Sequence, residues 1–479
     1  MSVQVLLLLA AAACGVSAFG NGAHSHPLAA WLAPVLLLAF VRAAPGRRGL
    51  LAAWLLFAAT WAFQWSEVFR ARGLELAIGA LLFGGLGLLP YLADRRWSPR
   101  LAPWAGTFVF PCAIVAFELL LARGSPYGAW GMVAYTQADV APVAQLAALA
   151  GTAGVAFLVA WLAPVALLAF RDRMATRDAR TTAIAWSLVA VLALGWGWQR
   201  VHASAQSGAP LAIAFVLPDC EANCNYEAAR APALIDGLFR RSAGAAAAGA
   251  RLIAWPEDSF FVPRTESAAL AARAAAFARE HGVHLVIAYG ERERAGELRY
   301  RNLSVLFGPD GAERWRYAKS HGVPGYEERY MARGDGRLVS ASTPFGRVAG
   351  MICFDADHSG MLRQLGGAHD LLLLPSDDWP AIEWLHAAMV RIRAIEQGIA
   401  IARPTINGRS VAYDARGRVV AELPAGSSGT ILAAQLPLAR EATPFVRIGD
   451  APSWACVAAL GLLAFATRRR RTAALPVAA

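Results

Sequence analysis

The hydrophobic residues of this sequence follow two different patterns along the chain. Up to about residue 200 they form long runs with few charges, whereas residues 209–445 alternate short apolar strings with helical stretches. Because a transmembrane helix needs roughly 20 mostly apolar residues, the pattern predicts eight spans, seven before the alternating segment and one after it. They are expected near residues 3–18, 28–42, 50–66, 75–93, 102–122, 143–170, 182–199 and 451–467.

Arginines cluster in every second connection between these runs and after the last run. An excess of Lys and Arg marks the cytoplasmic side of a membrane protein. Both chain ends are therefore expected in the cytoplasm and residues 209–445 outside, which in a bacterial inner membrane is the periplasm. The first run could instead be a cleaved signal peptide, because small residues surround Ala18, but it lacks the basic stretch of such signals. The clusters are Arg42, Arg47 and Arg48; Arg95, Arg96 and Arg100; Arg171, Arg173, Arg177 and Arg180; and Arg468 to Arg471.

The alternating segment predicts a layered α/β domain. Strands are expected at 211–217, 252–256, 284–290, 302–308, 313–317, 347–353, 370–375, 409–415 and 418–423. Helices are expected at 226–249, 266–282 and 384–398. The chain is thus expected to divide into a transmembrane domain (1–205), an α/β domain (209–445), and a closing helix with a basic tail (450–479).

Composition agrees with a membrane protein, since 57% of the 479 residues are hydrophobic and only 16% are charged. The net charge of +11 does not indicate nucleic-acid binding, because the arginines sit in short clusters between apolar runs and not along a polar or aromatic-rich face. The nine histidines show no metal-ligand spacing, so we expect no metal site.

The six cysteines separate by position. Cys220 and Cys224 lie outside the membrane and four residues apart, where they could form a local disulfide, although the spacing alone leaves this open. Cys353 remains as a candidate for chemistry. The other three lie in apolar spans, where a thiol usually serves as a small hydrophobic group: Cys14, Cys112 and Cys456.

Lysine occurs once in the chain, at Lys319, so the other 44 of the 45 cationic residues are arginines. A compact ammonium can approach a reacting atom more closely than a planar guanidinium can. Lys319 follows one predicted strand, Glu257 follows another, and Cys353 ends a third. A nucleophilic thiol needs a base and an electropositive neighbour, and these three residue types together could provide them.

Three segments that contain these residues resemble the motifs of the nitrilase, or carbon-nitrogen hydrolase, superfamily: WPED (255–258), YAKSHGVPGYEE (317–328) and TPFGRVAGMICFD (343–355). With the spans around them, they resemble the apolipoprotein N-acyltransferase family, to which residues 118–137, 389–398 and 403–410 are also similar. The resemblance implies that residues 209–445 form a four-layer αββα sandwich.

The resemblance also implies a role for each matching residue. Cys353 would be the nucleophile, Glu257 the proton acceptor and donor, and Lys319 a donor to the oxyanion. Glu327 matches the second glutamate of the family and could orient Lys319 or the incoming amine. The backbone N–H of Phe354 would be the second oxyanion donor.

The reaction implied by the resemblance is a two-step acyl transfer. The sn-1 acyl chain of a membrane phospholipid would pass to the cysteine as a thioester, and then to the α-amine of a diacylglyceryl-cysteine at a lipoprotein N-terminus. The expected partners are therefore this phospholipid, the lipoprotein and the bilayer. No cofactor is implied, and we expect a monomer.

Some positions depart from the family pattern. The chain has Cys353-Phe354-Asp355 where the family usually has Cys-Tyr-Glu, so Asp355 is a shortened supporting carboxylate. The loops after Lys319 and at Ser376 also differ from the usual sequences. A different acyl donor or acceptor, or a membrane-tethered amidase that releases its thioester to water, remains an alternative. A non-enzymatic transporter or scaffold would explain the spans but not the Glu, Lys and Cys set.

Overall fold

The computed structural model describes residues 2–203, 210–220, 224–294 and 297–472. The chain forms two compact units, one of Met1–Gly124, Gly131–Val201 and Ile448–Ala479, and one of Ser125–Trp130 and His202–Arg447. The short segment Ser125–Trp130 thus belongs to the second unit, although its neighbours in sequence belong to the first. The expected boundary between residues 205 and 209, and the end of the basic tail from residue 473, lie outside the described residues.

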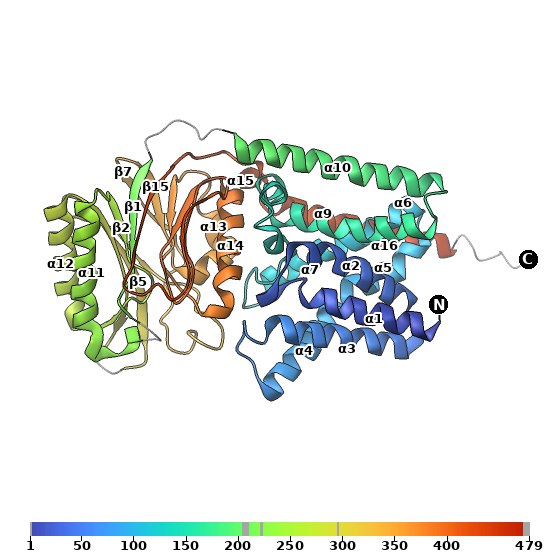
Figure 1. Ribbon diagram of the computed structural model, residues 1–479, viewed down its shortest axis with the longest axis horizontal. Coiled ribbons are helices and arrows are strands. Elements are labelled where there is room, and N and C mark those ends of the chain that lie inside the picture. The colour runs from blue at the N-terminus through green and yellow to red at the C-terminus, as the bar shows by residue number, and fades with distance from the viewer. Residues whose placement is uncertain (1, 204–209, 221–223, 295–296, 473–479) are drawn as a thin grey trace, which may run out of the picture. The chain divides into compact units, whose positions relative to one another are not determined.

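The first unit is helical (Figure 1). Its α-helices are α1 (Val3–Ala18), α2 (Pro27–Ala43), α3 (Gly46–Trp65), α4 (Gly73–Gly87), α5 (Leu89–Trp97), α6 (Pro103–Gly106), α7 (Val109–Gly124), α8 (Ala141–Ala144), α9 (Leu146–Arg171), α10 (Arg177–His202) and α16 (Ala451–Thr472). Short 3-10 helices are η1 (Gly22–His24), η2 (Ser98–Arg100) and η3 (Val133–Gln137). Every apolar run that predicted a span falls on one or two of these helices.

Among the described residues, five helical stretches are long and apolar enough to cross a membrane: Gly73–Arg100, Pro103–Gly124, Leu146–Arg171, Arg177–His202 and Ala451–Arg468. Two further apolar helices, α1 and α2, are shorter. The expected count of eight spans therefore remains a prediction. An ion pair joins two of the helices, since Nε of the partly exposed Arg42 on α2 lies 2.7 Å from Oδ2 of the buried Asp94 on α5.

The second unit contains two large β-sheets. The first has the strand order β15-β1-β2-β4-β5-β6, with β3 paired to β4, and the second has the order β14-β13-β11-β9-β8-β7. A short parallel pair, β10 with β12, stands apart from them. The strands are β1 (Leu211–Val216), β2 (Leu252–Ala254), β3 (Phe261–Pro263), β4 (His284–Arg292), β5 (Tyr300–Phe307), β6 (Glu313–Ala318), β7 (Val339–Thr343), β8 (Gly346–Gly350), β9 (Leu371–Leu373), β10 (Ser376–Asp377), β11 (Ala400–Arg403), β12 (Thr405–Ile406), β13 (Ser410–Tyr413), β14 (Val419–Leu423) and β15 (Ile431–Leu436).

Helices cover the outer face of each sheet (Figure 1), with α11 (Ala231–Ala247) and α12 (Arg264–His281) beside the first, and α13 (Ser359–Arg363) and α14 (Glu383–Gln397) beside the second. The unit is therefore the predicted four-layer αββα sandwich. Its remaining helices are η4 (Cys224–Tyr226), η5 (Ala228–Arg230), η6 (Cys353–Asp357), η7 (Pro380–Ile382) and α15 (Pro444–Ile448).

Strand β1 shows why the predicted strands of residues 209–445 are continuous apolar runs without alternating polar residues. Ile213 and Phe215 lie in the core between the two sheets, whereas Ala214 and Val216 lie in the core beneath α11 and α12. Successive side chains of a strand point to opposite faces. Because both faces are covered here, neither can be polar.

One local prediction was wrong in a way that matters for the site. Cys353 was expected to end a strand, but β8 ends at Gly350 and Cys353 is the first residue of η6. The backbone of Cys353 has a φ of 45°, in the left-handed region that residues other than glycine rarely adopt. The nucleophile candidate therefore sits on a sharp turn between a strand and a short helix.

Candidate active site

Glu257 is placed by the end of strand β2, three residues beyond Ala254, and its side chain is only 1% exposed. Both carboxylate oxygens are bound. Oε1 accepts hydrogen bonds from Nζ of Lys319 at 2.7 Å and from Nδ2 of Asn302 at 2.6 Å, and Oε2 accepts one from the backbone N–H of Asp377 at 2.7 Å. These contacts fix the orientation of the carboxylate.

Lys319 follows strand β6 directly and is as buried as Glu257. Its ammonium lies between two carboxylates, since Nζ is also 2.6 Å from Oε2 of Glu327. Glu327 is held in turn by the backbone N–H of Val323 at 3.0 Å and by the hydroxyl of Tyr300 at 3.3 Å. The single lysine of the chain is therefore a fixed buried cation.

Cys353 is buried, and its thiol donates a hydrogen bond to the backbone carbonyl of Asp377 with a distance of 3.7 Å from Sγ to O. Burial, and then the negative charge of Glu257, raise the pKa of the thiol well above its usual value, while the ammonium of Lys319 opposes them. The resting cysteine is thus a neutral thiol that needs a base to become a nucleophile.

The two groups around the thiol are suited to proton transfer and charge stabilisation. Burial raises the pKa of Glu257, with Lys319 opposing the rise. Burial alone would lower the pKa of Lys319, but the carboxylates of Glu257 and Glu327 outweigh it and raise that pKa well above its usual value. A carboxylate with a raised pKa beside a permanent cation can accept a proton and return it.

Phe354 and Asp355, which follow Cys353 on η6, are also buried. The Asp355 carboxylate accepts hydrogen bonds from the Tyr317 hydroxyl at 2.7 Å and from the backbone N–H of His321 at 2.9 Å. It also lies 3.2 Å from the backbone nitrogen of Ser320, which donates to it. Asp355 therefore links the turn of Cys353 to the loop that follows Lys319, and it lies outside the set around the thiol.

Sequence reasoning missed Asn302 and Asp377. Asn302 lies on β5, and its amide binds Glu257 while its backbone carbonyl accepts from the N–H of Lys319 at 2.9 Å. Asp377 lies on β10 and contacts the site through its backbone. The signal for the first was an asparagine beside the apolar part of a predicted strand, in YRNLSVLF.

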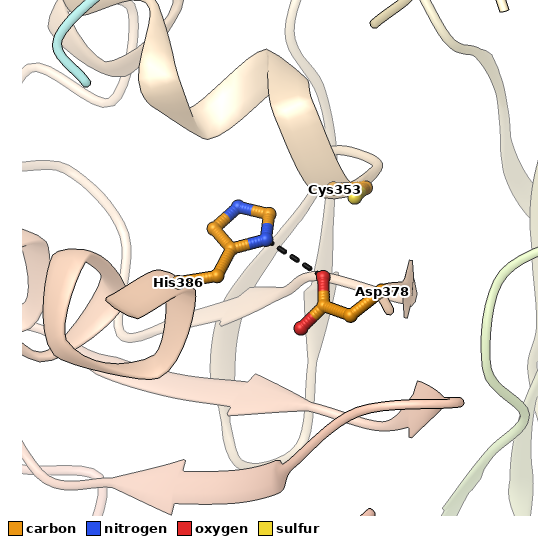
Figure 2. Close-up of side chains that lie close together, drawn as sticks. All are labelled: Cys353, Asp378 and His386. Atoms are coloured by element: carbon orange, nitrogen blue, oxygen red, sulfur yellow. Dashed lines mark hydrogen bonds and ion pairs between the residues drawn. The ribbon is translucent and has the colours of Figure 1, made fainter. Parts of the chain in front are cut away.

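A second group of buried ionisable residues also lies next to Cys353, and the sequence did not predict it. Asp378 and His386 are hydrogen-bonded to each other near the thiol (Figure 2). Atoms of Cys353, Asp378 and His386 that could ligate a metal all lie within 4.8 Å of one another, as do those of Glu257, Asp258 and Glu327. A cationic side chain is already bound to each set: Arg403 to Asp378 in the first, and Lys319 to Glu257 in the second.

A disulfide joins Cys220 and Cys224, so this pairing, which the sequence left open, is present. The 3-10 helix η4 starts at Cys224 and carries two residues toward the site. Asn225 donates to the backbone carbonyl of Asp258 at 2.8 Å, and the hydroxyl of Tyr226 donates to Oδ2 of Asp377 at 3.1 Å.

Comparison with known proteins gives matches over both parts of the chain. Residues 197–443 match the carbon-nitrogen hydrolase family, and residues 11–165 match the apolipoprotein N-acyltransferase N-terminal domain. Among curated relatives, the apolipoprotein N-acyltransferase of Bradyrhizobium diazoefficiens is 30% identical over 86% of this chain and 81% of its own length. Those of Geobacter metallireducens and Bordetella bronchiseptica are each 26% identical, over 76% and 98% of this chain and 74% and 97% of their own lengths.

Proposed function

Because the chain belongs to the apolipoprotein N-acyltransferase family, with its carbon-nitrogen hydrolase domain, we propose that it transfers an acyl chain from a membrane phospholipid to the N-terminal amine of a diacylglyceryl-cysteine on lipoproteins. The observation that carries this proposal is the buried ammonium of Lys319, hydrogen-bonded to Glu257 and Glu327, in a site where Glu257 adjoins the thiol of Cys353. The site needs no cofactor for this chemistry.

In the first step, Glu257 takes the proton of the Cys353 thiol while sulfur attacks the carbonyl carbon of the sn-1 ester. The carbonyl oxygen becomes an oxyanion, which Lys319 and the backbone N–H of Phe354 stabilise. The ester C–O bond then breaks, and the lysophospholipid oxygen takes the proton from Glu257. The acyl chain remains on Cys353 as a thioester.

In the second step, the α-amine attacks the thioester carbon and passes a proton to Glu257. The C–S bond breaks, an amide forms, and Glu257 returns the proton to the sulfur. Glu327 keeps the Lys319 ammonium in place during both steps. Asp355 supports the loop beyond Lys319 through its hydrogen bonds to Ser320 and His321.

The same proposal places the catalytic site on the periplasmic side of the inner membrane. Both substrates are anchored in a bilayer, so a catalytic domain in the periplasm, tethered to the inner membrane, meets them without extracting whole lipids. An alkaline phosphatase fusion after residue 205 should be active, and one after Arg471 should be inactive. The reverse pattern would place residues 209–445 in the cytoplasm and exclude the lipoprotein substrate.

The acyl-enzyme provides the direct test of function. Purified full-length protein, incubated with a phospholipid labelled in its sn-1 chain, should carry the label on the Cys353 peptide as an adduct that hydroxylamine removes. Adding a diacylglyceryl-cysteinyl peptide should move the label to its α-amine. Labelling that persists in Cys353→Ala would refute the proposal, and label lost to water at the same rate with and without the peptide would instead indicate an amidase-like hydrolase.

A further inference from the structure

Four buried ionisable side chains form a cluster next to Cys353 that the proposed mechanism does not use. They come from separate elements and none is more than 5% exposed: Asp357 at the end of η6, Asp378 after β10, His386 on α14 and Arg403 on β11. The thiol of Cys353 lies within 4.8 Å of ligand atoms of Asp378 and His386. Figure 2 shows the imidazole and the Asp378 carboxylate joined beside the cysteine turn.

Both ring nitrogens of His386 face carboxylates. Nδ1 lies 2.7 Å from Oδ1 of Asp378, and Nε2 lies 3.3 Å from Oδ2 of Asp357. A neutral imidazole has one N–H, whereas the protonated ring has two. Only the imidazolium carries a proton on each nitrogen: Nδ1 is hydrogen-bonded to Asp378, whereas Nε2 faces Asp357 at an ion-pair distance without forming a hydrogen bond.

The contact with Arg403 taken alone favours an unprotonated Nδ1, because a guanidinium N–H needs an acceptor, so the protonation state is decided by the shorter contact between Nδ1 and Asp378. Nη2 of Arg403 lies 2.9 Å from Nδ1 of His386 and 2.7 and 2.8 Å from the two oxygens of Asp378. A neutral ring could accept from Arg403, but its Nδ1 lone pair would then face a carboxylate oxygen at 2.7 Å. Burial alone would lower the pKa of His386, yet Asp357 and Asp378 raise it to about 9, with Arg403 opposing them.

With the imidazolium present, the cluster holds two anions and two cations. Despite burial, His386 and a hydrogen bond from Trp130 keep the pKa of Asp357 below its usual value, and Arg403 and His386 do the same for Asp378. His358, which follows Asp357, has a lowered pKa because of burial and adds no charge at neutral pH. Loss of the His386 proton would therefore leave one net negative charge beside the thiol.

Such a charge would act on Cys353 directly. Asp378 already raises the pKa of the thiol and Arg403 lowers it, in addition to the effects of burial and of Glu257 and Lys319. A nearby anion disfavours formation of a thiolate. His386 cannot replace Glu257 as the base, because the imidazolium already carries a proton on each ring nitrogen. The guanidinium of Arg403, bound to Asp378, neutralises that carboxylate without a metal ion.

We propose that His386 is a positioning residue which, as an imidazolium bridging Asp357 and Asp378, cancels the charge beside Cys353 and holds the cysteine turn against the strand end that carries Asp377. This inference rests on the proposed role of Cys353 as nucleophile. The position of the bridge suits both the charge cancellation and the holding of the turn, since Asp357 ends the helix that Cys353 begins. Asp378 follows the residue whose backbone contacts Glu257 and the thiol.

The test measures how readily the Cys353 thiol ionises, without any acyl donor. Full-length protein in detergent is treated with iodoacetamide between pH 6 and 10, and alkylation of the Cys353 peptide is followed by mass spectrometry. Because the pKa of the thiol lies well above its usual value, the alkylation rate should rise with pH across this range. In His386→Gln the profile should shift upward by about one unit, so that alkylation below about pH 9, where His386 of the wild type is protonated, is about tenfold slower.

Two further variants separate charge from structure. Asp378→Asn removes an anion and should shift the profile downward, and the double variant His386→Gln/Asp378→Asn should return it toward wild type. Damage to the fold would not produce shifts of opposite sign or their cancellation. If His386→Gln does not fold, as judged by its thermal transition, Asp378→Asn carries the test alone.

His369→Gln is the matched control, because His369 is a buried histidine whose Nδ1 contacts the Leu365 carbonyl and which lies outside this cluster. Its profile should overlay that of wild type. An unshifted profile for His386→Gln, or shifts of the same sign for His386→Gln and Asp378→Asn, would overturn the inference. Acyl labelling of Cys353→Ala would refute the proposed function separately, since alkylation does not depend on acyl transfer.

Discussion

The backbone of Asp377 holds Glu257, because its N–H donates to Oε2 of that carboxylate at 2.7 Å. The carbonyl of the same residue accepts the hydrogen bond of the Cys353 thiol. One residue of a two-residue strand thus fixes the proposed base and orients the proposed nucleophile. Backbone groups cannot be removed by side-chain substitution, so only the side chains around them can be varied.

Cys353→Ser should fold and remain nearly inactive. The pKa of a serine hydroxyl is far above that of a thiol, and the burial that already raises the pKa of Cys353 would oppose an alkoxide even more. The measurement is the rate of acyl-enzyme formation from labelled phospholipid, with the thermal transition as a check on folding. Turnover comparable to wild type would exclude a thiolate mechanism.

Lys319→Arg should lose most activity even though the charge is kept. The Lys319 ammonium occupies a buried position 2.7 and 2.6 Å from two carboxylates, and the larger guanidinium would displace Glu257 or Glu327. Removing one oxyanion donor typically costs about 10² to 10³ in rate, and we expect Lys319→Arg and Lys319→Ala both to fall in this range. A folded arginine variant within about threefold of wild type would rule out the oxyanion role, given that scale.

Asp355→Asn should slow acyl-enzyme formation by about tenfold while the protein still folds. The amide can accept fewer of the donors from Tyr317, Ser320 and His321, and hydrogen bonds to a charged group are worth about 1.5–3 kcal/mol. The loop that follows Lys319 would lose part of its anchor. Asp335→Asn, at an exposed aspartate of the same region, is the control and should behave as wild type.

The layered fold followed from the sequence because its central strands are apolar on both faces and its long helices end at clear signals. Helices α12 and α14 stop at Gly282 and Gly398, both in the left-handed conformation that glycine adopts most readily. Strands β10 and β12 were not predicted, since two residues carry no periodicity. Strands β3 and β11 were missed because they are only three and four residues long, and β7 and β15 were missed because they are edge strands with partly exposed side chains.

The site was predictable only in part, for a related reason. Glu257, Lys319 and Cys353 lie in motifs that resemble those of a known superfamily, and the structure brings all three together. Asp357, Asp378 and His386 lie on η6, after β10 and on α14, and they meet only when these separate elements pack together. Local sequence patterns do not predict contacts between separate elements, and each of these residues alone looks like an ordinary polar residue.

The disulfide is expected to be dispensable for chemistry. Replacing Cys220 and Cys224 by serine should lower the thermal midpoint, because the cross-link no longer restrains the unfolded chain. Acyl-enzyme formation should persist, since the two sulfurs do not contact Glu257, Lys319 or Cys353. A folded double variant that cannot form the acyl-enzyme would show that η4 controls the site through Asn225 and Tyr226.

His386 should make the protein less stable as the pH rises above neutrality. Its pKa in the folded protein is about 9, above its ordinary value of 6.5, so between these values the folded state binds more protons than the unfolded state. The stabilisation is fully present below pH 6.5 and is lost as the pH rises through 9. The free energy of unfolding should therefore fall across this window with a slope of at most about 1.4 kcal/mol per pH unit from this residue.

The difference between wild type and His386→Gln isolates this contribution, because other titrating groups are common to both proteins. The thermal midpoint of the detergent-solubilised full-length protein should fall between pH 6.5 and 9.5 more steeply in wild type than in the variant. His284 is the matched control: burial lowers its pKa to about 4, so its contribution varies only between about pH 4 and 6.5 and has the opposite sign. His284→Gln should therefore keep the wild-type slope above pH 6.5. Equal slopes for wild type and His386→Gln would mean that His386 does not bear a proton between Asp357 and Asp378.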